Sequence, residues 1–178
     1  MVAVLKRTST PTQADFQAAI AARANGWYSA CLRITRNPQL AEDALQDALL
    51  NAWKNRQQFQ HGAKLETWIH SIAVNSALAT LRKQRPQAFE PLEADFEDPS
   101  ASADESHYHD ELHTELDIAL QMLTDDERLC FVLRHLEQWN LKEIAAAVGK
   151  NANAVKQSLF RAVRKLRNEM PALAREAR

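Results

Sequence analysis

The sequence predicts an all-α protein made of two small helical domains joined by an acidic linker. Proline is absent from residues 39–85 and from residues 100–170, whereas three prolines lie together between these stretches, at Pro86, Pro91 and Pro99. Proline breaks helix interiors and glycine is unfavourable there. Since the 178 residues include only three glycines, both stretches are expected to be helical. No segment alternates apolar and polar residues between turn signals, so a β-sheet is not expected. We predict a first domain at 12–86, a linker at 87–111 and a second domain at 112–170.

The composition excludes membrane-spanning and disulfide-stabilised classes of protein. The longest apolar runs are only a few residues long, so direct insertion into a membrane is not expected. The N-terminal sequence MVAVLKRTSTPTQADF lacks the apolar region and cleavage site of a signal peptide, so we expect a cytoplasmic protein. Cys31 and Cys130 fit neither a disulfide framework nor a zinc site, and we interpret them as buried thiols on apolar helix faces.

The first domain is expected to contain about four helices, of which three can be placed. One covers 12–35 and ends before Asn37-Pro38, because the residue before a proline disfavours helix. A second covers about 40–59, with an apolar face at Ala41, Ala44, Leu45, Ala48, Leu49 and Ala52. After a short loop with Gly62, a third covers 65–81, with the same periodicity at Leu65, Trp68, Ile69, Ile72 and Ala73. These apolar faces predict a helical bundle.

Capping signals divide the second domain into shorter helices. Thr124 and Glu127 form a capping-box pattern, which predicts a helix with apolar residues at Leu129, Val132, Leu133 and Leu136. Asn140 is expected to cap a short helix that ends at Gly149, a residue able to take the left-handed conformation. Asn153 is expected to cap a longer helix with a buried face at Val155, Leu159, Ala162, Val163 and Leu166. A short helix, a tight turn with glycine and a longer basic helix predict a helix-turn-helix motif.

The last helix of this motif leaves a basic side uncovered. Opposite its apolar face lie Lys156, Gln157, Phe160, Arg161, Arg164, Lys165 and Arg167. Cations can neutralise DNA phosphates, and arginine or glutamine can reach base edges in the major groove. A solvated charged face is the alternative, but an exposed aromatic residue and the preceding turn favour DNA. The N-terminal half of such a helix reads the bases. We therefore assign DNA contact to Asn153, Lys156, Gln157, Phe160, Arg161 and Arg164.

Two polar groupings mark the first domain. Asp43, Gln46 and Asp47 share one helix face, opposite the apolar face of the second helix, and such a face suits a basic protein partner or is simply solvated. We interpret Asn75 as an exposed amide on a turn, in a segment that also contains Trp68.

The basic pair Arg82 and Lys83 lies downstream of this segment. An amide beside aromatic and basic residues can read an unstacked base, although Trp68 taken alone is better interpreted as a core residue.

The net charge of -1 hides a segregation of charge along the chain. Residues 86–127 hold 14 of the 23 acidic residues and no lysine or arginine, which leaves all 22 basic residues and nine acidic ones outside. Basic blocks indicate a polyanionic partner. The acidic stretch between them is either more than a passive tether or a solvated linker that keeps the chain soluble.

Taken in order, these motifs resemble a known family. The segments AEDALQD at 41–47, AW at 52–53, TWI at 67–69, IAVN at 72–75 and RK at 82–83 look like the second domain of a bacterial sigma factor. Residues 123–167, with EIA at 143–145 and LFRA at 159–162, resemble its fourth, helix-turn-helix domain. With these two domains and a short linker, the chain resembles the extracytoplasmic-function (ECF) group of the sigma-70 family over about 12–86 and 112–170.

The resemblance implies a sigma factor that binds core RNA polymerase, through the beta-prime and beta subunits, and recognises promoter DNA. It also implies initiation of transcription at a stress- or signal-responsive regulon, no catalytic activity of its own, no cofactor, and control by a membrane-associated anti-sigma factor. Three positions match the motif that docks on the beta-prime coiled coil: Asp43, Gln46 and Asp47. Four match the region that recognises and melts the minus-ten element: Trp68, Asn75, Arg82 and Lys83. The minus-thirty-five element is assigned to Asn153, Lys156, Gln157, Phe160, Arg161 and Arg164.

Other readings are weaker. A sigma-like mimic that only sequesters an anti-sigma factor would lack a basic recognition helix, and a stand-alone repressor would leave the acidic face and linker unexplained. His107, His109 and His113 have a spacing that could bind a transition metal, but no further ligand or cysteine lies nearby, so no metal site is expected. No Ser/His/Asp grouping or glycine-rich phosphate loop indicates an enzyme.

Overall fold

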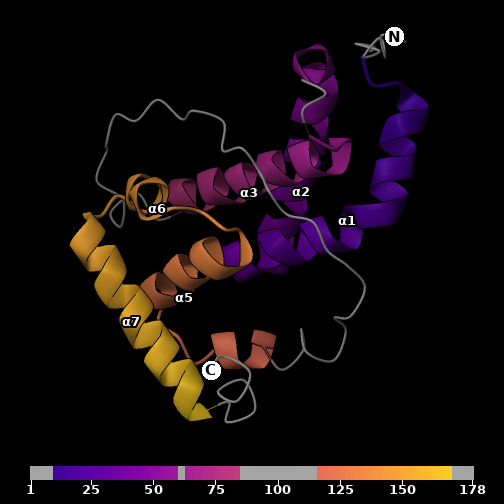
Figure 1. Ribbon diagram of the computed structural model, residues 1–178. Coiled ribbons are helices and arrows are strands. Elements are labelled where there is room, and N and C mark those ends of the chain that lie inside the picture. The colour runs from indigo at the N-terminus through magenta and orange to yellow at the C-terminus, as the bar shows by residue number, and fades with distance from the viewer. Residues whose placement is uncertain (1–9, 60–62, 85–115, 170–178) are drawn as a thin grey trace, which may run out of the picture. The chain divides into compact units, whose positions relative to one another are not determined.

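The computed structural model describes residues 10–59, 63–84 and 116–169, and all of their regular elements are helices (Figure 1). The chain forms two compact units, residues 1–81 and 82–178. The all-α prediction is confirmed. The acidic linker lies outside the described residues, as do His107, His109 and His113.

The first unit begins with α1, Gln13–Thr35, and the polar residues at its ends define it. Thr12 is the N-cap, and its hydroxyl accepts from the Asp15 backbone N–H while the Asp15 carboxylate accepts from the Thr12 N–H at 2.7 Å. Arg36 ends the helix in the left-handed conformation, with φ of 56°. Asn37 then caps the next helix, and Pro38 occupies a first-turn position where no N–H partner is lost.

Helix α2, Pro38–Lys54, buries one face made of small residues, Ala41, Ala44, Ala48 and Ala52. It ends five residues before the predicted position. The Asn55 backbone and side chain both donate to the Asn51 carbonyl, and a separate 3₁₀ turn, η1, follows at Arg56–Gln58. The Arg56 guanidinium stacks over Trp53 at 4.1 Å and donates to the Trp53 carbonyl, which closes this helix end.

Helix α3, Leu65–Gln84, completes the core of the first unit. Its apolar face supplies fully buried side chains that join those of α1: Trp27, Ile34, Ile69, Val74 and Leu78. The Cys31 thiol is buried and donates to the Ala73 carbonyl at 3.6 Å, which ties α1 to α3. The bundle of three long helices leaves the outer face of α2 uncovered.

In the second unit, α5, Asp125–Phe131, runs into a π-helical turn, η3, Val132–Leu136, where the sequence predicts one continuous helix. Gln138 follows in the left-handed conformation at φ of 63°, and Arg134 donates to the Trp139 carbonyl at 2.9 Å across the turn. Helix α6, Leu141–Val148, and helix α7, Ala152–Glu169, complete this unit. Within the described residues, no helix is both long and apolar enough to cross a membrane.

Candidate functional site

Helices α6 and α7 form a helix-turn-helix whose turn is set by local hydrogen bonds. The Asn140 side chain accepts from the Lys142 and Glu143 N–H groups, and the Glu143 carboxylate accepts from the Asn140 N–H at 2.6 Å. Gly149 ends α6 in the left-handed conformation at φ of 64°, where a side chain would be strained. The three residues 149–151 therefore connect the two helices, a turn length typical of the motif.

The N-cap of α7 differs from the prediction. The Asn151 side chain accepts from the Ala154 N–H at 2.8 Å, and its carbonyl accepts from Val155, so Asn151 rather than Asn153 is the cap. Asn153 lies inside the first turn of α7 with its side chain exposed. Because Asn153 does not cap the helix, its side-chain amide faces outward with the other exposed residues of α7.

The outward face of α7 combines cations, amides and one aromatic ring. Lys156, Gln157, Arg161 and Arg164 are exposed, and the ring of Phe160 is 69% exposed, while Val155, Ala162 and Leu166 are buried on the opposite side. From Asn153 to Arg164 this face is about 16 Å long, which matches roughly five base pairs of B-form DNA at about 3.4 Å each. We name this set of residues the α7 outer face: Asn153, Lys156, Gln157, Phe160, Arg161 and Arg164.

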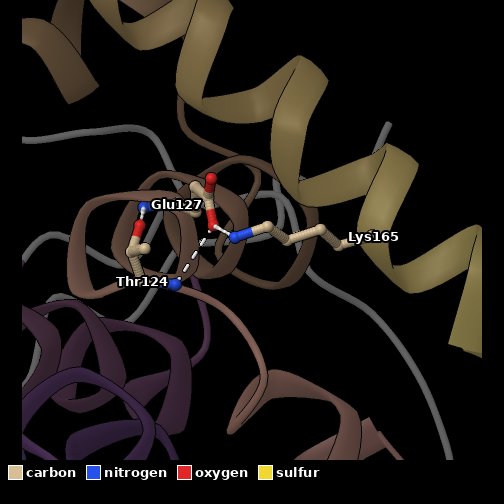
Figure 2. A network of polar contacts seen from close by, with 3 residues as sticks. All are labelled: Thr124, Glu127 and Lys165. Atoms are coloured by element: carbon tan, nitrogen blue, oxygen red, sulfur yellow. Dashed lines mark hydrogen bonds and ion pairs between the residues drawn. The ribbon is translucent and has the colours of Figure 1, made fainter.

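Lys165 departs from the predicted outer side of the helix. Its Nζ donates to the Glu127 carboxylate at 2.7 Å, and Figure 2 shows the lysine reaching across from α7 to the start of α5. The Glu127 side chain is 6% exposed and also accepts from the Thr124 N–H at 3.1 Å. Burial raises the pKa of Glu127, but these bonds from Lys165 and Thr124 outweigh it, so the pKa is lowered overall.

A second ion pair joins the same turn of α5 to the helix-turn-helix. Lys150, in the turn before α7, pairs with Asp126, whose side chain is 56% exposed. The acidic first turn of α5 therefore neutralises two lysines, Lys150 and Lys165, that the charge pattern alone would offer to DNA.

The thiol of Cys130, also on α5, is buried. Burial raises the pKa of this thiol to about 11, which leaves it protonated and inert.

In the first unit, the acidic face of α2 is exposed as predicted. Asp43, Gln46 and Asp47 all point away from the buried alanines of this helix. Leu50 lies at the C-terminal end of the same face and is 55% exposed, a feature that the sequence reasoning missed. Its position three residues after Asp47 and four after Gln46 is the signal that could have placed it there. We name these four residues the α2 face.

The residues assigned to the minus-ten region all lie on α3, and one of them is placed differently from the prediction. Asn75 is in the middle of α3 and only partly exposed, so it is neither on a turn nor freely exposed. The apolar stretch before it simply continues the helix. Trp68 is partly buried and packs against Phe59, with ring centroids 5.4 Å apart. Arg82 and Lys83 lie in the last turn of the helix.

The described parts of the chain contain no grouping of three or more His, Cys, Asp or Glu that could hold a metal ion. His107, His109 and His113, the residues considered for such a site, lie outside these parts.

Comparison with known proteins gives the family. Residues 20–87 match the sigma-70 region 2 family model, and residues 113–166 match that of sigma-70 region 4. The RNA polymerase sigma factor CarQ of Myxococcus xanthus is 34% identical over 154 residues, which cover 86% of each chain. The ECF RNA polymerase sigma factor SigG of Mycobacterium tuberculosis is 30% identical over 168 residues, 81% of this chain and 45% of its own length. The chain thus spans less than half the length of SigG.

A solved structure has the same fold. The sigma factor RpoE of Bartonella quintana, crystallised with the anti-sigma factor NepR, superposes with a TM-score of 0.52 at 22% identity, covering 89% of this chain and 98% of that one. Both domain models match in order, and CarQ is matched over most of its length. The chain therefore belongs to the extracytoplasmic-function group of the sigma-70 family of sigma factors.

Proposed function

We propose that this protein is a promoter-specificity subunit of bacterial RNA polymerase, which binds core enzyme and directs it to a set of stress- or signal-responsive promoters. The observation that supports this most strongly is the α7 outer face: a helix-turn-helix presents cations, amides and an exposed ring together, in a chain of this family. The chain itself performs no chemistry in this proposal and acts in the cytoplasm, where the polymerase transcribes.

The α7 outer face is proposed to read the minus-thirty-five element. Arg161 and Gln157 can pair with base edges in the major groove, and Lys156 and Arg164 can bind phosphates on either side of it. The N-terminal half of a helix-turn-helix recognition helix enters the groove, which fits the exposure of Asn153 at the first turn. Phe160 supplies an apolar contact of the kind that a thymine methyl group accepts.

The α2 face is proposed to bind core polymerase through the beta-prime coiled coil. Two carboxylates and an amide lie beside Leu50 on one exposed side of α2. The carboxylates can steer a basic partner into place, and the exposed apolar side chain beside them adds affinity once water is excluded. The beta subunit is expected to complete the interface.

The minus-ten element is proposed to meet α3. Trp68 and Asn75 are two helical turns apart and both are partly exposed, so a ring and an amide lie along one side of this helix. An aromatic ring can stack on an unpaired base while an amide binds its edge. Lys83 is exposed at the end of the same helix and can bind an adjoining phosphate. The Arg82 guanidinium donates to the Ala147 carbonyl at 2.7 and 3.1 Å, so it can bind a phosphate only after leaving this contact.

Regulation by an anti-sigma factor, membrane-associated as in many members of this group, is part of the proposal. The Bartonella quintana neighbour was crystallised with an anti-sigma factor, NepR. The acidic linker at 87–111 is proposed to follow a basic path in the polymerase, in place of nucleic acid.

Transcription in vitro tests the function. Core polymerase, with and without the full chain, is incubated with a library of randomised promoters, and the transcripts are sequenced. We expect transcripts that depend on the chain and share two promoter elements. A sigma-like mimic would bind core or an anti-sigma factor and yield no transcripts, and a stand-alone repressor would select a palindrome without needing core. Either result would overturn the proposal.

A further inference from the structure

We propose that the ion pair between Glu127 and Lys165 is a positioning contact, which sets the rotation of α7 about its own axis and so fixes which side chains enter the DNA. Neither residue touches DNA in this arrangement. The inference rests on the proposed role of α7 in reading the minus-thirty-five element, and it assigns a specificity role to two residues outside the α7 outer face.

The Glu127 carboxylate is held in place by the capping box, and Lys165 approaches it from one side of α7. The Glu127 carboxylate is held by the Thr124 N–H at 3.1 Å, while the Thr124 hydroxyl accepts from the Glu127 N–H, so the capping box immobilises the acceptor (Figure 2). Lys165 then reaches it at 2.7 Å from a helix that is 38 residues away in the sequence. A fixed acceptor therefore receives a bond from one flank of α7.

The position of Lys165 on α7 makes this bond sensitive to rotation. Successive helical residues are about 100° apart, so Lys165 lies on the flank between the outward Arg164 and the buried Leu166. A rotation of α7 by about 20° would move a side-chain tip, about 5 Å from the axis, by about 2 Å. A bidentate contact to a base edge is lost over such a shift. A carboxylate that is almost fully buried resists this movement, because losing its cation would leave a buried charge unpaired.

The neighbouring ion pair supplies a matched control. Asp126 and Glu127 are adjacent in the first turn of α5, and each binds one lysine of the helix-turn-helix. The two pairs differ in their carboxylates, since the Asp126 side chain is 56% exposed and that of Glu127 is 6% exposed. The lysines are both partly exposed, Lys150 at 30% and Lys165 at 44%. Exposed pairs contribute little and are screened by salt, so the Asp126 pair with Lys150 is not expected to hold α7 in register.

The experiment compares variants of the full chain, assembled with core polymerase, on the promoter recovered from the library and on a duplex with a scrambled minus-thirty-five element. Binding is measured from about 50 to about 200 mM salt, which gives the preference for the promoter and the salt slope. The variants are Lys165→Met, Lys165→Arg, Glu127→Gln, Asp126→Asn and Arg164→Met. Thermal melting establishes that each is folded at the temperature of the assay.

We expect Lys165→Met to lower the preference for the promoter about tenfold while the salt slope stays as in the wild type. Arg164→Met, which removes a phosphate contact, should lower the slope by about one. Lys165→Arg should keep the preference, because arginine can bind the same carboxylate. Asp126→Asn should leave both quantities unchanged.

Glu127→Gln keeps the hydrogen bonds of the cap but removes the negative charge that binds Lys165, leaving at most a weaker neutral hydrogen bond, so the preference should fall without loss of slope. This variant also tests the inference if Lys165→Met does not fold. A slope that falls by about one in Lys165→Met would make Lys165 a phosphate contact, and an unchanged preference in both Lys165→Met and Glu127→Gln would remove the positioning role. Failure of the proposed function is distinct, since the wild type itself would then show no preference for the promoter.

Discussion

Replacing Phe160 with alanine separates the contribution of an apolar contact from that of charge. An aromatic side chain buries about 150–250 Å² when fully covered, and 69% of Phe160 is open to solvent. Roughly 100–170 Å² is thus available to DNA, which at about 25 cal/mol per Å² would contribute about 2.5–4 kcal/mol if all of it were covered. With about half covered, Phe160→Ala should weaken binding to the promoter by about 1–2 kcal/mol, or roughly five- to thirtyfold.

The unfolding free energy should change by less than about 0.5 kcal/mol, because the ring is exposed and alanine favours helix. The salt slope should not change, whereas Lys156→Ala, which removes a proposed phosphate contact, should lower it by about one. Binding of the polymerase complex to promoter duplexes at several salt concentrations, with thermal melting of each variant, measures all three quantities. An unchanged affinity in Phe160→Ala would mean that the ring does not meet DNA, and an altered slope would mean that the variant disturbs the cations beside it.

Three further predictions follow from the other surfaces. The double variant Asp43→Arg, Gln46→Ala should weaken association with core polymerase at least about tenfold, or about 1.4 kcal/mol, without lowering the melting temperature. Glu42→Arg, which reverses a charge at an exposed position on another side of α2, should have little effect on this association in the same pull-down. An equal loss of association in Glu42→Arg and in the double variant would disprove a local docking site. Asn75→Ala should slow promoter melting while association with core stays normal, as stopped-flow fluorescence of a base analogue would record; a normal rate would leave Asn75 a structural residue of α3. The lowered pKa of Glu127 stabilises the folded second unit fully above the ordinary glutamate value of about 4.3, and this stabilisation is lost as the pH falls through the folded-state pKa. Chemical denaturation of the full chain between about pH 3 and 7 should therefore show a smaller loss of stability in Glu127→Gln than in the wild type, and equal losses would exclude the coupling.

Features that depend on neighbours in the sequence could be predicted. The capping boxes at Thr124 and Asn140 and the left-handed Gly149 are confirmed, because each is set by residues within a few positions of one another. The spacing of apolar residues likewise predicted the buried alanine face of α2. The roles proposed for the α2 face and the α7 outer face stay predictions.

The errors have two physical sources. The first is local ambiguity: the segment KNAN at 150–153 offers two asparagines as caps, and the length of the turn after Gly149 selects Asn151. Likewise, nothing in the segment around Asn75 breaks a helix, so α3 continues through it.

The second source is packing between distant segments. The partner of Lys165 lies 38 residues away on α5, and no periodicity within α7 distinguishes this lysine from the exposed Arg164. The exposure of Leu50 depends on which side of α2 the rest of the bundle covers, and the alanine face could have indicated it.

The central claim is that this chain makes core polymerase open a promoter, which a protein that only binds duplex DNA through a helix-turn-helix does not do. Permanganate footprinting of the recovered promoter, with core polymerase and the full chain, measures this directly, because permanganate oxidises unpaired thymines. We predict reactive thymines at the minus-ten element that require both core and the chain. Protection of the minus-thirty-five element without any reactive thymine would contradict the account.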